Sequence, residues 1–162
     1  MTELSRSITL RAVTPVDRDF LLTVFASTRS NELAALGGNS PEAQAFAQMQ
    51  FTLQQQAYSA AYPAAENSII LLAEQPIGRM LVERTDAAIL LIDIAILNDY
   101  RNRGIGSSLI RGLMDEAAGS QKSVRLSVYK SNPAARLYER LGFSLIADHG
   151  LYFERIWPSA NS

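Results

Sequence analysis

The stretch from Asp99 to Ile110, "DYRNRGIGSSLI", places two arginines and two closely spaced glycines directly before an amphipathic run. If a helix begins near Gly104, its first backbone N–H groups have no partner within the helix and point outward. The helix dipole adds partial positive charge there, and glycines let an anion approach the N–H groups closely. Arg101 or Arg103 could add charge-assisted hydrogen bonds. The stretch has the groups that bind a pyrophosphate, although a tight turn before a helix also explains the glycines.

One charged side chain stands alone in an apolar run. Asp93 lies in "AAILLIDIAIL", where a buried carboxylate needs a partner or a function. The alternative to a functional role is a structural ion pair or hydrogen bond.

Several kinds of site are excluded or disfavoured by the sequence. The chain has no cysteine, which excludes disulfides, thiolate metal sites and a thiol nucleophile. Its one histidine, His149, has no Gly-x-Ser-x-Gly motif to accompany it, and we expect no metal site. The glycine stretch lacks the lysine of a P-loop, and Leu109 occupies the place of the third glycine of a dinucleotide-binding fingerprint.

Hydrophobic periodicity predicts the elements that position these residues. The second predicted helix, from Ser40 onward, is expected to bury Phe46, Met49, Leu53 and Ala57, and the turn in 67–84 is expected at Glu74-Gln75-Pro76. In the short helix that carries Tyr138, Asn132 is the expected N-cap, Pro133 the first residue and Gly142 the stop. The predicted order is a strand at 7–13, helices at 14–27 and from 40, two strands within 67–84, a strand at 87–97, a helix from 104, a strand at 123–129, a helix at 132–143, and paired strands at 144–150 and 151–157.

Length and composition predict one globular domain, residues 1–162, with 48% apolar and 19% charged residues. No apolar run is long enough to span a membrane, and the N-terminus does not resemble a signal peptide, so we expect a cytoplasmic protein without membrane partners. The net charge of −1 hides an asymmetry: residues 101–140 carry eight basic and three acidic side chains. The overall balance argues against a nucleic-acid partner.

The motif Arg101-x-x-Gly104-x-Gly106 after a buried strand, followed about 30 residues later by "NPAARLYERLGF", resembles the GNAT family of acetyl-CoA-dependent N-acetyltransferases. The resemblance covers the order of elements along nearly the whole chain, and its specific motifs run from Ile89 to Phe143. It implies an α/β (α+β) fold: a mixed, mostly antiparallel sheet of about seven strands flanked by about four helices. It also implies a V-shaped splay between the two central parallel strands.

The resemblance implies that acetyl-CoA is the cosubstrate and that its pyrophosphate lies on the loop from Arg101 to Gly106. The pantetheine arm is expected along the end of the preceding strand, and Asn132, which is also a plausible helix cap, is expected to contact it. The adenosine 3′-phosphate is expected to bind one of three basic residues, Lys130, Arg136 or Arg140. Of these, Arg136 is included among the expected cofactor-binding residues. The expected cofactor-binding residues are Ile94, Ala95, Ile96, Leu97, Arg101, Asn102, Arg103, Gly104, Ile105, Gly106, Ser107, Asn132 and Arg136.

The resemblance further implies that Tyr138, in "NPAARLYERLGF", is the general acid that protonates the departing thiolate. A phenol with an ordinary pKa of about 10 is protonated at neutral pH and can donate. The alternative is a buried core tyrosine. Asp93 is the expected general base, acting through water; Glu83 is a weaker alternative. Ser127 stands where some family members place a glutamate, which leaves the base less well defined. Because the chain has no cysteine, we expect direct transfer in a ternary complex. His149 is expected to lie exposed, without a chemical role.

The family builds its acceptor site from regions that correspond here to 28–63 and 147–152. Between Asn31 and Tyr100, eight acidic residues face two arginines, which favours a cationic primary amine, either a small molecule or a peptide. Dimers are common in the family, so a homodimer is one expected arrangement. The alternative function is a non-catalytic acyl-CoA-binding sensor or structural module of the same fold.

Overall fold

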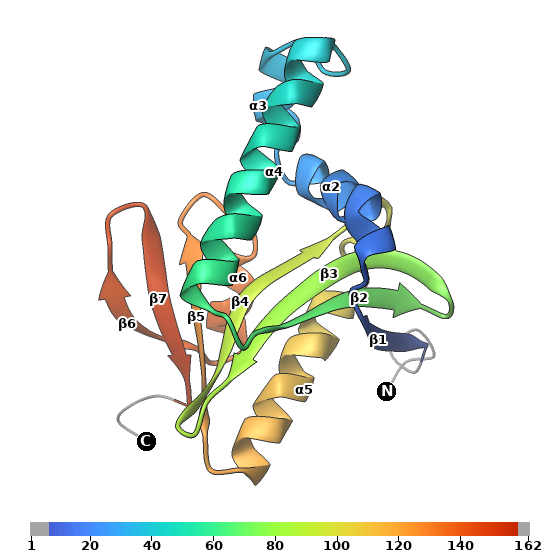
Figure 1. Cartoon of the computed structure of the whole chain (residues 1–162). Coiled ribbons are helices and arrows are strands. Elements are labelled where there is room, and N and C mark those ends of the chain that lie inside the picture. Colours follow the sequence, from blue (N-terminus) through green and yellow to red (C-terminus); the bar gives the residue numbers. More distant parts are fainter. Residues whose placement is uncertain (1–6, 159–162) are drawn as a thin grey trace.

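One mixed sheet of seven strands, in the order β1-β2-β3-β4-β5-β7-β6, organises the molecule (Figure 1). The structure, a computed structural model, describes residues 7–158. Every neighbouring pair of strands is antiparallel except β4 and β5, which are parallel. The strands are β1 (Ile8–Ala12), β2 (Glu66–Leu72), β3 (Gln75–Arg84), β4 (Ala88–Ile96), β5 (Ser123–Tyr129), β6 (Ser144–Asp148) and β7 (Tyr152–Trp157).

Helices cover both faces of this sheet (Figure 1). The larger core lies on the face covered by α5 and α6, where Ile110 and Leu113 pack against strand residues such as Ile89 and Val124. A smaller core lies under α2 and α4 around Phe25 and Phe51. The helical segments are η1 (Pro15–Asp17), α2 (Arg18–Ser27), α3 (Ser30–Ala35), α4 (Pro41–Ala61), η2 (Asn98–Tyr100), α5 (Ile105–Gly119) and α6 (Ala135–Arg140).

The predicted fold class is confirmed, and the predicted strands and the long helix after Gly104 lie close to where the sequence placed them. Within residues 7–158 there are five α-helices rather than about four, because α3 follows α2 after a short break. The turn between β2 and β3 is at Ala73-Glu74, so Pro76 already belongs to β3. The single domain 1–162 stays a prediction, and its first six and last four residues lie outside the described residues.

The predicted buried face of α4 is wrong. Met49 and Leu53 are about half exposed, whereas Ala43, Ala47 and Phe51 are buried. These three recur every four residues, and two are alanines, so this face lets α4 approach α2 closely. The small side chains of Ala43 and Ala47 determined which face of α4 is buried. The larger apolar side chains of Met49 and Leu53 lie on the exposed side of the helix.

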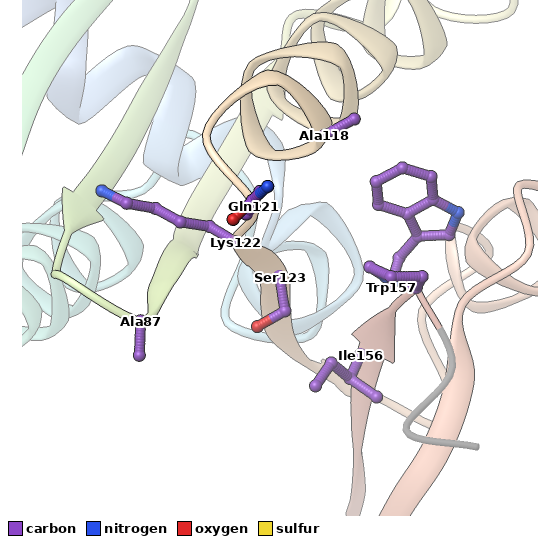
Figure 2. Close-up of a pocket in the computed structure, with 8 residues that line it drawn as sticks. Ala87, Ala118, Gln121, Lys122, Ser123, Ile156 and Trp157 are labelled. Carbon is purple, nitrogen blue, oxygen red and sulfur yellow. The ribbon is translucent and has the colours of Figure 1, made fainter. Parts of the chain in front are cut away.

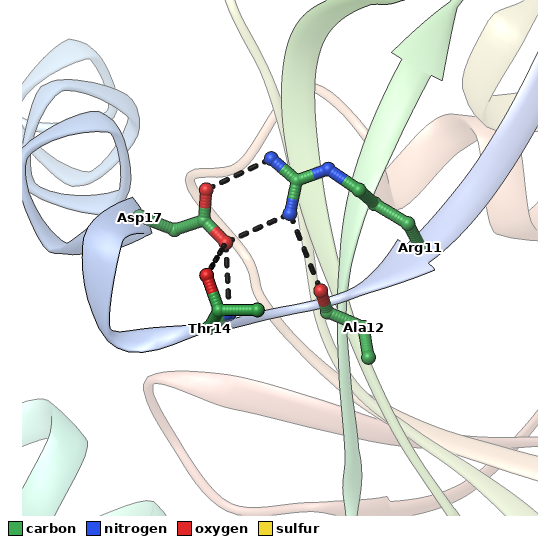
Figure 3. A network of polar contacts seen from close by, with 4 residues as sticks. All are labelled: Arg11, Ala12, Thr14 and Asp17. Atoms are coloured by element: carbon green, nitrogen blue, oxygen red, sulfur yellow. Dashed lines mark hydrogen bonds and ion pairs between the residues drawn. The ribbon is translucent and has the colours of Figure 1, made fainter.

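A polar network joins β1 to the start of α2 (Figure 3). The Asp17 carboxylate accepts two hydrogen bonds from the Arg11 guanidinium, both at 2.8 Å, and one from the Thr14 backbone N–H at 2.8 Å. These bonds, with that to Arg11 contributing most, hold the pKa of Asp17 well below its usual range. The network fixes the chain where it leaves the sheet edge to enter the helices.

Replacing Asp17 with Asn should lower the melting temperature at neutral pH, because the charge-assisted hydrogen bonds are lost. A carboxyl whose pKa is depressed by folding stabilises the native state above the unfolded pKa of about 4, and this contribution is lost as pH falls below it. The gap in melting temperature between D17N and the wild type should therefore narrow below about pH 4. The matched control is D19N in the first turn of α2. A gap that stays constant from pH 7 to pH 3, or equals that of D19N, contradicts this account.

Candidate active site

The parallel strands β4 and β5 separate part of the way along their length. They pair only from Ala88 with Ser123 to Leu91 with Leu126. Beyond that point β4 continues to Ile96 alongside β3, while β5 continues to Tyr129 alongside β7. A register shift in β4 opposite Leu81/Val82 lies where the separation begins. The strands thus form the expected V-shaped splay.

The side of β4 that faces the splay has no strand partner beyond Leu91 within residues 7–158. This stretch includes the predicted cofactor-binding residues Ile94, Ala95 and Ile96, and Leu97 directly follows it. Arg101 reaches back to this edge, where its Nε donates a hydrogen bond of 2.7 Å to the Ile96 carbonyl. Free backbone groups along a strand edge can pair with an extended, amide-containing ligand.

The glycine loop begins at the end of β4 and leads into α5. Two of its residues have left-handed backbone conformations, Asn102 at φ 62° and Gly104 at φ 80°. Gly104 is the N-cap of α5, and no side chain caps this end of the helix. The first turn of α5, which contains Ile105, Gly106 and Ser107, also carries no acidic residue. Its N–H groups and partial positive charge therefore remain available to an anion.

The two glycines have different roles. The positive φ of Gly104 strains any residue that carries a Cβ. Gly106 has ordinary helical geometry, and a Cβ there would meet only Ile96 Cδ1 at 3.7 Å, a normal contact. Within the described part of the chain, nothing therefore requires glycine at 106. Absence of a side chain there instead leaves the helix N-terminus open.

Two exposed arginines, Arg101 and Arg103, precede this end of α5. The guanidinium of Arg103 lies 5.4 Å from the centre of the Tyr100 ring. Neither Arg101 nor Arg103 forms an ion pair with an acidic residue in 7–158. Both charges are therefore free to attract a phosphate.

Tyr138 points from α6 into the core. The residue is 5% exposed, and its ring packs edge-on against Phe143 with the ring centres 5.7 Å apart. Burial, and secondly the nearby Asp93 charge, raises the pKa of Tyr138 to about 12. Its hydroxyl has no hydrogen-bond partner among residues 7–158. The phenol is therefore protonated at neutral pH and free to donate.

Asp93 lies in the part of β4 that has no β5 partner, opposite Leu81 of β3. Its closest charged neighbour is Arg79, whose Nε is 3.7 Å from Asp93 Oδ2. Arg79 is 3% exposed, and its Nη1 donates a 3.0 Å hydrogen bond to Gln55 of α4. Burial raises the pKa of Asp93, an effect opposed by the positive charges of Arg79 and then Arg29.

Sequence reasoning missed Arg79 and Tyr58 as neighbours of Asp93. The Arg79 guanidinium lies 5.7 Å from the centre of the Tyr58 ring. Burial, followed by the Asp93 charge, raises the pKa of Tyr58 to about 12. A signal for Arg79 was present, because it is a lone charge within the apolar part of β3, just as Asp93 is in β4. Tyr58 carried no such signal, since only the path of α4 brings it near Asp93.

The residues predicted for the cofactor arm and 3′-phosphate lie around α6. Its first helical residue is Ala135, so Asn132 is not the N-cap; instead its side chain accepts a 2.9 Å hydrogen bond from the Ala134 N–H in the preceding turn. Lys130 is engaged in an ion pair with Asp148 at 2.8 Å. Arg136 and Arg140 are exposed, and neither forms an ion pair within the described residues.

The other acid–base alternatives lie less favourably. Glu83 pairs with Leu90, near the closed end of the splay. Ser127 lies opposite Glu154 of β7, so an acid does neighbour this position, from the next strand. Glu154 lies 3.4 Å from His149, whose ring stacks on Tyr152. His149 is partly exposed, as expected.

A hollow of about 520 Å³ lies at the opposite end of β4 and β5 from the glycine loop (Figure 2). Its lining includes Lys122 and Trp157, but no carboxylate or tyrosine, so it is not the candidate site.

Among residues 7–158, no group of three or more acidic, histidine or cysteine side chains could hold a metal ion. Within the same range, none of the helices combines the length and hydropathy needed to cross a bilayer.

Comparisons with known proteins agree with this geometry. A family model described as "Acetyltransferase (GNAT) domain" matches residues 65–145, half of the chain. A comparison with curated proteins found no match.

Solved structures similar to this chain share its fold. The PaiA N-acetyltransferase of Thermoplasma acidophilum, in complex with coenzyme A, is 18% identical with a TM-score of 0.65, covering 93% of this chain and 98% of that one. An acetyltransferase of Thermus thermophilus is 23% identical with a TM-score of 0.63, covering 94% and 97%. A GNAT family acetyltransferase of Elizabethkingia anophelis with acetyl-CoA bound is 15% identical with a TM-score of 0.59, covering 93% and 97%.

Proposed function

Because this chain belongs to the GNAT acetyltransferase family, we propose that it transfers an acetyl group from acetyl-CoA to a primary amine by direct attack in a ternary complex. The observation that carries the proposal is the splay between β4 and β5, which opens beside the uncapped N-terminus of α5. The strand edge of β4, the uncapped N-terminus of α5 and the buried phenol of Tyr138, which senses the charge of Asp93, support the proposal together. Each matches a different part of the expected cosubstrate.

The proposed acetyl-CoA site uses backbone groups and charge. The pyrophosphate would lie on the N–H groups of α5 beside Gly106, with Arg101 and Arg103 adding charge. The pantetheine arm would lie along the side of β4 that has no β5 partner, from Ile94 to Ile96, and reach Leu97 directly after the strand. The open space at Gly106 supports this assignment, because a large side chain there would stand in front of the helix N-terminus.

Acetyl-CoA supplies an activated thioester, and the residues of the chain manage the protons. As the acceptor nitrogen bonds to the thioester carbon and the carbon–sulfur bond breaks, Tyr138 gives its proton to the thiolate. Asp93 takes the proton that the amine loses, through water. The protonated Tyr138 phenol and the electrostatic proximity of the two groups support this division of roles.

The proposed acceptor is a primary amine of a small molecule or a peptide. The acidic bias of residues 31–100 supports a cationic amine, although Arg79 places positive charge beside Asp93. A single domain, a homodimer and a cytoplasmic location stay predictions. A panel of polyamines, amino acids and peptides separates the acceptor classes, and preference for anionic acceptors contradicts the charge argument.

Thermal unfolding with and without ligands tests the cosubstrate. Acetyl-CoA or CoA at 100 times its dissociation constant should add about 2.7 kcal/mol of stability. For a domain of this size that raises the melting temperature by roughly 5–10 °C. ATP and NAD at the same concentration serve as controls for general phosphate binding. An absence of any shift with either CoA species at millimolar concentration contradicts the proposal.

A further inference from the structure

We propose that Arg79 is a positioning residue that holds the Asp93 carboxylate in its charged form and in one orientation for the reaction. The inference rests on the proposed function, in which Asp93 accepts a proton. It adds Arg79 of β3, held by Gln55 and Tyr58 of α4, to the proposed acid and base on α6 and β4.

The sheet register places the two side chains together. Leu81 of β3 is the direct partner of Asp93, so Arg79, two residues away on the same strand face, is its diagonal neighbour. The Arg79 Nε lies 3.7 Å from Asp93 Oδ2, too far for a hydrogen bond. This buried Nε has no hydrogen-bond partner within the described residues. The pair therefore interacts mainly through charge.

Helix α4 holds the guanidinium in place. Gln55 accepts a 3.0 Å hydrogen bond from Arg79 Nη1, and the Tyr58 ring centre lies 5.7 Å from the guanidinium carbon. Gln55 and Tyr58 are three residues apart, on one face of α4. A buried arginine held from two sides has little freedom to turn away from Asp93.

The charges around Asp93 make Arg79 the dominant favourable partner. Burial raises the pKa of Asp93, and Arg79 opposes this most, ahead of Arg29. The other groups that face it are the neutral phenols of Tyr58 on α4 and Tyr138 on α6. Without Arg79, the carboxyl, which is 26% exposed, would take up a proton at a higher pH and lose its capacity as a base.

The first measurement is a ¹³C NMR titration of the Asp93 carboxyl in the free protein, assigned by its absence in D93N. In R79Q the pKa of Asp93 should rise by about 1–3 units. In R79K it should stay close to that of the wild type, because the charge is kept. The matched control is R84Q, which removes an arginine of the same strand that pairs with Glu66 and Glu116 instead. An unchanged pKa in R79Q overturns the inference.

The second measurement is the pH dependence of kcat/KM with one acceptor, so that the amine's own titration is common to all variants. The fall of kcat/KM at low pH, the acid limb of the profile, should move to higher pH in R79Q by the same amount as the pKa of the Asp93 carboxyl. In R79K the acid limb should lie at the wild-type pH. If R79Q does not fold, Q55L, which removes the hydrogen bond to Arg79, should move both readouts in the same direction. If R79Q, or Q55L in its place, folds and its acid limb lies at the wild-type pH, the inference is overturned.

The D93N variant separates the two proposals. Loss of the acid limb and a fall in kcat/KM of about 10²-fold or more support Asp93 as the base. A wild-type profile in D93N overturns the role of Asp93 in the proposed function, and the role of Arg79 falls with it. If the acid limb of the kcat/KM profile disappears in D93N but keeps its wild-type position in R79Q, only the inference on Arg79 is overturned.

Discussion

Replacing Tyr138 with Phe should lower kcat for acetyl transfer by about 10²–10⁴-fold, the range expected when a general acid is removed. The substitution deletes one oxygen that has no partner among residues 7–158 and keeps the ring that packs on Phe143. The core should therefore remain intact. KM for acetyl-CoA should change little, because the phenol is expected to act on the departing thiolate. Release of the CoA thiol measures the rate.

Tyr62, the C-cap of α4, provides the matched control for this prediction, because it lies in the expected acceptor region 28–63 but has no proposed role in proton transfer. The variant Y62F should keep the wild-type kcat. A Y138F enzyme with a rate within a few-fold of wild type contradicts the general-acid role. If the wild-type protein binds CoA but turns over no amine in the panel, the alternative of a non-catalytic acyl-CoA sensor is supported instead.

Replacing Gly106 with Val should weaken CoA binding by about 10²–10⁴-fold while leaving the free protein folded. The valine side chain would stand before the N-terminus of α5 and prevent about two charge-assisted hydrogen bonds, each worth about 1.5–3 kcal/mol. In the free protein, a Cβ at 106 makes only an ordinary contact with Ile96. Isothermal titration calorimetry with CoA gives the dissociation constant.

Two variants isolate the effect of the side chain at 106. Gly112 lies on the exposed face of the same helix with no atom near its would-be Cβ, so G112V reproduces the helix-propensity cost of a valine. G106A adds only a Cβ, which makes an ordinary contact with Ile96, so it should bind CoA almost as well as the wild type. Equal affinities in G106V and G112V would show that the pyrophosphate does not lie on α5.

The local elements were largely predictable because each is encoded by residues close together in the chain. The alternation in Ser123–Tyr129 predicted β5, and the four-residue repeat after Gly104 predicted α5. A lone charged residue in an apolar run, such as Asp93, can mark a candidate site, and this signal is also local. The α4 face was missed because burial there depends on which neighbour the helix meets, and Ala43 and Ala47 permit the closer approach.

The sequence by itself determined the family, the order of elements, and the three segments from which the candidate site is assembled: β4, the glycine loop and α6. Short-range periodicity, capping chemistry and motif spacing are local properties, so they can be recognised without coordinates. Only the tertiary structure decided where β4 and β5 separate, and that Arg79, Gln55 and Tyr58 surround Asp93. Those contacts join segments far apart in the chain, and strand register and helix packing fix them jointly.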